Sequence, residues 1–165
     1  MDMAQLGFND EDMLAGLKPW VLCESPSYDP AAVNRMQDIA AHELAVMGAS
    51  IERISPHTSI GDCIRARFAH PQSDQPGLLI VGHMDTVHPI GTLAQLPFKR
   101  DGNRCYGPGI CDMKGGNYLA LEAIRQLNKA GLETPLPITV LFTSDEEIGS
   151  PQTRALIEAE ATRAK

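Results

Sequence analysis

The feature that most constrains the fold of this chain is a pair of short apolar runs with a helical segment between them. The runs occupy residues 78–81 and 138–142, and apolar residues recur on one face of the segment 114–129 before Gly131 ends it. Continuous apolar runs are typical of strands that are covered on both faces. A helix between such strands favours an α/β domain, so the sequence predicts a mostly parallel central sheet flanked by helices.

The segments on either side of this unit continue the alternation of helices and strands. Apolar periodicity predicts helices at about residues 11–24 and 30–48, the second with a proline in its first turn. Residues 49–54 and 62–68 alternate well enough to be strands, and a last helix is expected to start near residue 150. The sequence shows no repeat or linker, so we expect a single domain.

The composition limits the classes of partner. The chain has 165 residues, of which 43% are hydrophobic, and a formal net charge of −7. Nucleic acids and anionic membranes are held largely by clustered Lys and Arg, so an acidic chain without a basic run is not expected to bind either. A small or peptide-like substrate fits better. The first residues lack the pattern of a secretory signal, and no apolar stretch is long enough to span a bilayer, so we expect a cytoplasmic protein.

A histidine and several acidic residues follow the two apolar runs. His83 and Asp85 come directly after the first run, and Glu146 and Glu147 come after the second. In open α/β sheets the ligand crevice lies outside the carboxyl ends of the strands, so these residues can meet there. Asp112 lies at the start of the intervening helix, in a loop that glycines and a proline fix in place. The sequence therefore predicts the metal site of a hydrolase.

The residue types suggest which role each side chain has in such a site. An imidazole that binds zinc commonly has its second ring N–H held by a carboxylate, so we expect His83 to be a ligand and Asp85 to orient it. A bridging carboxylate holds two cations about 3.5–4 Å apart, and Asp112 suits that bridge, although an Asp at a helix start also serves as a cap. Adjacent Glu146 and Glu147 cannot point the same way in an extended segment, so one can bind metal while the other faces water.

Three segments carry a resemblance to a known family. They read GHMDTV at residues 82–87, YGPGICDMKGG at residues 106–116 and DEEIGS at residues 145–150. In this order they resemble the motifs of the co-catalytic di-zinc peptidases, which include glutamate carboxypeptidases, aminoacylases and succinyl-diaminopimelate desuccinylases. The resemblance covers nearly the whole chain and is strongest between residues 78 and 150.

The resemblance implies a reaction and a role for each residue. It implies a metal-dependent hydrolase of peptide or N-acyl amino acid amide bonds, glutamate-carboxypeptidase-like, in which a glutamate activates a metal-bound water. His83 would bind one zinc ion, Asp112 would bridge both ions and Glu147 would bind the other. Glu146 would be the general base, and Asp85 would orient His83. Two zinc ions are the expected cofactor, with cobalt or manganese as substitutes.

The resemblance also implies what this chain lacks. Family members carry a further acidic ligand and a final histidine ligand beyond the Glu-Glu motif, and the sequence stops before either. We therefore expect residues 1–165 to be the N-terminal part of an incomplete zinc-peptidase catalytic domain with a phosphorylase/hydrolase-like fold. The inserted dimerisation domain and the C-terminal part are absent. A homodimer is expected for the full-length protein.

The competing interpretation is a non-catalytic one, in which the chain is a truncated or structural fragment without the complete metal site. His88 is then the first replacement ligand to consider if zinc is held. Lys114 is expected to be a solvated residue in the first turn of its helix. The four cysteines show no C-x-x-C spacing and are expected to be free thiols, and Cys111 has no histidine placed by sequence to activate it as a nucleophile.

Overall fold

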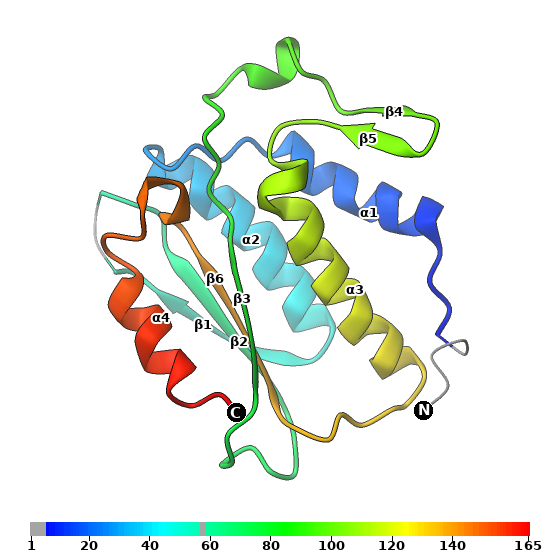
Figure 1. Cartoon of the computed structure of the whole chain (residues 1–165), viewed down its shortest axis with the longest axis vertical. Coiled ribbons are helices and arrows are strands. Elements are labelled where there is room, and N and C mark those ends of the chain that lie inside the picture. Colours follow the sequence, from blue (N-terminus) through cyan, green and yellow to red (C-terminus); the bar gives the residue numbers. More distant parts are fainter. Residues whose placement is uncertain (1–5, 57–58) are drawn as a thin grey trace.

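A four-stranded sheet with the order β1-β2-β6-β3 forms the centre of the computed structural model, which describes residues 6–56 and 59–165 (Figure 1). The first five residues, on which the expectation about a secretory signal rested, lie outside this part. The strands of the sheet are β1 (Ala49–Ile54), β2 (Cys63–Phe68), β3 (Leu78–His83) and β6 (Ile138–Thr143). A separate hairpin consists of β4 (Lys99–Asp101) and β5 (Arg104–Tyr106).

The helices agree closely with the apolar periodicity. They are α1 (Asp10–Leu22), α2 (Pro30–Val46), α3 (Gly115–Lys129) and α4 (Arg154–Ala161), with short helical turns η2 (Thr92–Ala94), η3 (Ile110–Lys114) and η4 (Glu146–Ile148). Side chains cap the first two helices, because Asn9 accepts a hydrogen bond from the Asp12 amide and Asp29 accepts one from the Ala32 amide. None of the helices in the described residues is long and apolar enough to cross a membrane.

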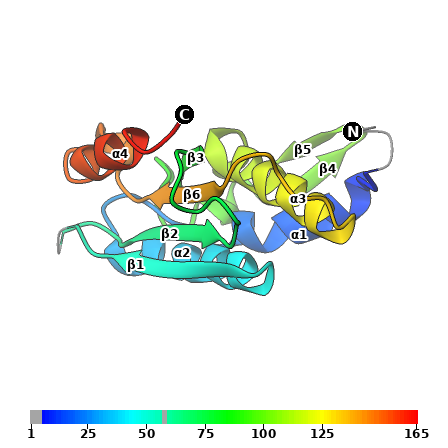
Figure 2. The same ribbon diagram turned by 90° about the horizontal axis from the view of Figure 1, so that it is seen from below.

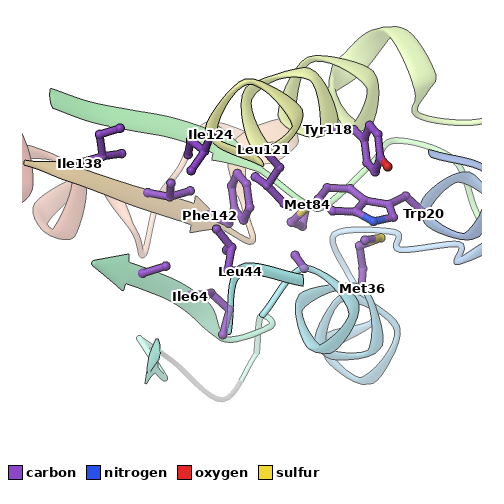
Figure 3. Close-up of a cluster of buried hydrophobic side chains, with 13 residues drawn as sticks. Trp20, Met36, Leu44, Ile64, Met84, Tyr118, Leu121, Ile124, Ile138 and Phe142 are labelled. Atoms are coloured by element: carbon purple, nitrogen blue, oxygen red, sulfur yellow. The ribbon is translucent and has the colours of Figure 1, made fainter. Parts of the chain in front are cut away.

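The sheet separates two layers of unequal size. Figure 1 shows α1, α2 and α3 on one side of the strands and α4 on the other, and Figure 2 shows the same arrangement from below. The core lies on the three-helix side (Figure 3), where Trp20 packs edge-on against Tyr118 and Phe142 with ring centroids 5.5 and 6.4 Å apart. This packing fixes α3, and with it the loop that precedes α3, against the sheet.

The predicted α/β class, with a central sheet flanked by helices, is confirmed, but the predicted pairing is not mostly parallel. β1 pairs antiparallel with β2, and β2 pairs antiparallel with β6. The single parallel pair of this sheet is β3 with β6, the two strands that α3 connects. A short connection between β1 and β2 returns the chain antiparallel, whereas the helical crossover returns it parallel.

The place of β3 in the sheet also differs from the expectation. Residues 78–81 were expected in a central strand covered on both faces, but β3 is at the edge of the sheet. Leu78 is 51% exposed and Val81 is 40% exposed, whereas most of β6 is buried. An apolar run alone does not distinguish an edge strand from a central strand, because strand order depends on contacts between distant segments.

Candidate metal centre

The candidate residues come together because β3 and β6 are parallel and in register. His83 is the last residue of β3 and lies opposite Thr143, the last residue of β6. The chain after β6 continues through Asp145 into η4, which contains Glu146 and Glu147. The two carboxyl ends therefore place the histidine and the acidic pair at the same edge of the sheet, as predicted.

Asp112 reaches this edge from the loop before α3. Gly109 has a positive φ of 71°, and the Lys114 amide donates to the Gly109 carbonyl, so the loop closes tightly just ahead of the helix. Asp112 itself has a non-helical backbone, and no side chain caps α3. The alternative role of Asp112 as a helix cap therefore finds no support, and its carboxylate faces the histidine instead.

The three proposed ligands converge on one point. One donor atom each from His83, Asp112 and Glu147 lies within 4.8 Å of the others. The His83 Nε2 atom is 2.9 Å from Asp112 Oδ1 and 3.7 Å from Glu146 Oε2. Donors about 2.0–2.2 Å from a zinc ion lie roughly 3.4 Å from one another, so small side-chain rotations would suffice to coordinate an ion. The predicted convergence is confirmed, and an imidazole with two carboxylates is a donor set that suits zinc.

Asp85 is the hydrogen-bonding centre of the site. Its carboxylate is fully buried and lies 3.4 Å from His83 Nδ1, which also contacts the Asp85 carbonyl oxygen at 2.9 Å. The backbone amides of Glu146 and Glu147 both donate to this carboxylate at 3.2 Å. Asp85 therefore contacts the His83 ring, as predicted, and it also fixes the backbone of the acidic pair.

Sequence reasoning did not identify Ser27, which completes the bonding of Asp85. Ser27 is 3% exposed, and its hydroxyl donates to Asp85 Oδ2 at 2.7 Å. The only sequence signal near it is the Ser-Pro-Ser break at residues 25–27, which marks the end of a helix and not a contact across 58 residues. Asn117 supports the other side of the site by donating to the His83 carbonyl at 2.8 Å.

The packing of α3 against β3 depends on Gly82. A Cβ atom placed on Gly82 would lie 2.0 Å from Asn117 Oδ1, which is closer than atoms can approach. A glycine before His83 therefore allows α3 to pack against the end of β3, and this packing brings the Asp112 loop to the histidine.

The ionisable groups of the site perturb one another. Burial lowers the pKa of His83, but hydrogen bonds to Asp85 and Asp112 outweigh it and raise that pKa to about 9. Burial raises the pKa of Asp85, yet hydrogen bonds from His83 and Ser27 hold it below its usual value. Burial and the neighbouring Asp112 carboxylate raise the pKa of Glu147. Clustered carboxylates around an imidazole favour a bound cation, which is what a metal site requires.

Lys114 is not the solvated residue that the sequence suggested. It is 1% exposed, and its ammonium group donates to the Cys23 carbonyl at 2.6 Å, at the end of α1. Burial lowers the pKa of Lys114 to about 8. The negative end of the helix dipole at the C-terminus of α1 favours this cation, so Lys114 ties the Asp112 loop to α1. The cysteines are free thiols, as expected.

Two cavities differ in their relation to this site. One of about 520 Å³ has Glu147 in its wall, together with residues that follow Ser25 and Asp85 in the chain. Another of about 370 Å³ lies between the loop before β3 and the end of α4, and Arg67 and Arg163 are among its lining residues. The second cavity contains none of the candidate metal residues in its lining, so the first is the one that adjoins the chemistry.

Comparisons with known proteins match about half of the chain in sequence. The family model described as Peptidase family M20/M25/M40 matches residues 79–165. Carboxypeptidase G2 of Pseudomonas sp. (strain RS-16) is 49% identical over 84 residues, which cover 51% of this chain and 20% of that protein. Acetylornithine deacetylase of Salmonella paratyphi B (strain ATCC BAA-1250 / SPB7) is 39% identical over 90 residues, which cover 53% of this chain and 23% of that protein.

Solved structures share the fold. Human carnosine dipeptidase 1 superposes with a TM-score of 0.79 at 23% identity, covering 93% of this chain and 36% of that chain. The metallo-carboxypeptidase Sso-CP2 of Sulfolobus solfataricus gives a TM-score of 0.74 at 19% identity, covering 96% of this chain and 36% of that chain. The matched region thus spans about a fifth of the length of the two sequence relatives and about a third of these two structures.

Proposed function

Since the chain belongs to Peptidase family M20/M25/M40, we propose that it is the N-terminal part of the catalytic domain of a zinc-dependent hydrolase that cleaves amide bonds in small peptides or N-acyl amino acids. The observation that carries the proposal is the convergence of His83, Asp112 and Glu147 within 4.8 Å. The family match and the 49% identity to a carboxypeptidase support it.

The proposed roles combine the contacts of each side chain with the family resemblance. His83 would hold one zinc ion through Nε2, Glu147 would hold the other, and Asp112 would be the ligand shared between them. Bound zinc would supply Lewis acidity to the amide carbonyl and lower the pKa of water. Asp85 keeps the His83 ring in place through Nδ1, while its bonds to the Glu146 and Glu147 amides hold the acidic pair at the site.

Glu146 is the proposed general base. Its side chain is 55% exposed and its Oε2 atom lies 3.7 Å from His83 Nε2, so it reaches the place where the ligands converge while remaining open to solvent. In the proposed reaction Glu146 accepts a proton from the attacking water and returns it to the leaving amine. Both glutamates lie in the short helical turn η4, and not in the extended segment assumed from the sequence.

The proposal extends to the organisation of the longer protein. The alignments cover only 20% and 23% of the two sequence relatives, which supports a longer protein. By the family resemblance, its remaining ligands, an acid and a histidine, would lie in a part beyond this chain. An inserted dimerisation domain would belong to that part, and the full-length protein would be a cytoplasmic homodimer. Cobalt or manganese would replace zinc in the same donor set.

Exchanging each glutamate for glutamine in the complete enzyme tests the roles. Glu146→Gln is expected to retain zinc and lower turnover by at least about 100-fold, because it removes the base without removing a ligand. Glu147→Gln is expected to lose zinc. Metal analysis beside kinetics separates the two effects, and loss of zinc from Glu146→Gln with retention in Glu147→Gln would reverse the assignment.

A further inference from the structure

The cavity beside Glu147 has a predominantly apolar wall that the proposed reaction does not use. It has a volume of about 520 Å³, which is in the range of small-molecule sites. Its apolar lining comes from Pro26, Tyr28, Val87, Pro89, Ile90 and Ile148. These residues come from three separate segments, which lie close in the sequence to Ser27, Asp85 and Glu147.

The exposed side chains in this wall are large. Tyr28 is 81% exposed, Val87 is 67% exposed and Ile90 is 54% exposed. Apolar side chains gathered in this way at a cavity mark a surface that binds a ligand, because covering them removes apolar area from water. Their position beside Glu147 places that ligand at the proposed reaction centre.

Backbone hydrogen bonds hold the wall of the cavity in place beside the metal centre. The Thr86 amide donates to the Ser25 carbonyl at 2.9 Å, and the Ser27 amide donates to the Thr86 carbonyl at 3.3 Å. The Glu24 carboxylate accepts from the Gly91 amide at 2.7 Å and the Leu93 amide at 2.8 Å, which fixes the far end of the loop that carries Val87 and Ile90. The cavity is therefore formed before a ligand arrives.

The charges of the wall select against an acidic ligand. None of the residues that line the cavity is basic, and two of them, Asp29 and Glu147, carry carboxylates. The Asp29 carboxylate is engaged with the Ala32 amide at the start of α2. A carboxylate that entered the cavity would find no basic side chain in its wall, whereas an apolar group would meet complementary surface.

We propose that this cavity is the subsite for an apolar side chain or acyl group adjoining the scissile amide, and that it disfavours a carboxylate at that position. The assignment of the bound group to a substrate rests on the proposed function, because the cavity is a substrate subsite only if Glu147 belongs to a hydrolytic centre. The proposed subsite narrows the substrate class to amides that carry an aromatic or branched aliphatic group on the side of the scissile bond that faces the cavity.

Two small amides with uncharged backbones serve as probes of the subsite, in NMR titrations of the isotopically labelled chain. N-acetyl-L-phenylalaninamide is expected to shift the amide resonances of Tyr28, Val87 and Ile90, and the α-amide of N-acetyl-L-glutamic acid is expected to bind there at least tenfold more weakly. Val87→Asp should weaken binding of the phenylalanine probe at least tenfold. Val46→Asp is the matched control, since Val46 is 74% exposed on α2 and does not line the cavity.

The outcomes separate the subsite from the proposed function. Thermal melts show whether both variants fold, and the titrations are run with a chelator and again with added zinc. Equal binding of the two probes, unshifted resonances at the three residues, or unchanged binding by Val87→Asp would each overturn the subsite. If the phenylalanine probe binds as expected while the complete enzyme neither takes up zinc nor cleaves amides, the proposed function fails and the apolar binding site remains.

Discussion

At the scale of single residues, Asp85 joins the two sides of the candidate metal centre. It accepts hydrogen bonds from Ser27 and from the amides of Glu146 and Glu147, and it contacts the His83 ring. The carboxylate is buried, so each of these donors would be left without a partner if Asp85 changed. An unpaired buried polar group costs more than the net value of the bond that it lost.

We expect Asp85→Asn to weaken zinc binding by the complete enzyme about 10- to 100-fold, because an amide cannot accept from all of these donors and hold the imidazole in the same orientation. The metal-free chain should lose about 1–3 kcal/mol of unfolding free energy as well. Competition with a zinc-chelating dye and urea unfolding measure the two effects. Asp74→Asn, on the exposed loop before β3, is the control, and equal zinc affinity in both variants would contradict the role of Asp85.

The raised pKa of His83 gives the metal-free chain a defined dependence on pH. The folded-state pKa is about 9, above the ordinary value of 6.5, so its stabilising effect is fully present below pH 6.5 and is lost as pH rises towards 9. The lowered pKa of Lys114, about 8, acts in the opposite direction from about pH 8 upward. Between pH 6.5 and 8, the change in unfolding free energy with pH therefore reports on His83.

Urea unfolding at a series of pH values, with a chelator present, checks this dependence. Over the range from pH 6.5 to 9 the His83 contribution should amount to at most about 3–4 kcal/mol, from 1.4 kcal/mol per pH unit. His83→Gln should lack the fall in unfolding free energy between pH 6.5 and 8. An identical pH profile for the variant and the parent chain would show that another group controls stability in this range.

At the scale of elements, the two faces of the sheet are held by different interactions. The three-helix side is apolar, whereas α4 is joined to β2 through Glu160, which is 5% exposed and accepts from Arg65 at 2.6 Å and from Arg67 at 3.1 Å. The exposed apolar side chains Leu78 and Val81 lie on the edge strand β3. An open edge of this kind favours self-association.

Removing the carboxylate of Glu160 should detach α4 from the sheet. Glu160→Ala removes the buried partner of two arginines that keep their contacts with Glu52, and we expect a loss of about 2 kcal/mol in unfolding free energy. Glu158→Ala on the same helix removes an exposed pair with Arg154 and should cost less than about 1 kcal/mol. Urea unfolding compares the two, and similar losses in both variants would show that the buried network contributes little.

At the scale of the whole molecule, the metal centre contains only some of the ligands that a two-zinc site is expected to have. His83, Asp112 and Glu147 give each of two ions two ligands when Asp112 bridges, fewer than the three or four protein ligands of stable zinc sites. His88, the first replacement candidate, is not in the cluster found among the described residues.

We therefore expect residues 1–165 alone to bind zinc weakly and to show little or no amide hydrolysis. Equilibrium dialysis followed by metal analysis, beside an amidase assay, provides the measurement. A longer product of the same reading frame is the comparison, and it should bind zinc stoichiometrically and turn over substrate. Tightly held stoichiometric zinc with turnover in the 165-residue monomer would contradict the proposed division of the site and would make His88 the first residue to mutate.

The sequence by itself determined the four helices and the four strands of the main sheet, although not the β4–β5 hairpin. It also determined that His83 and the Glu146–Glu147 pair follow strands and that Asp112 lies just before a helix, because apolar periodicity and turn residues act over a few neighbouring positions. Only the tertiary structure decided the strand order, the antiparallel pairing of β2 with β6 and the exposure of β3. It alone brought Ser27 to Asp85 and Lys114 to Cys23. These features depend on contacts between residues far apart in the chain, and local patterns do not specify which distant segments meet.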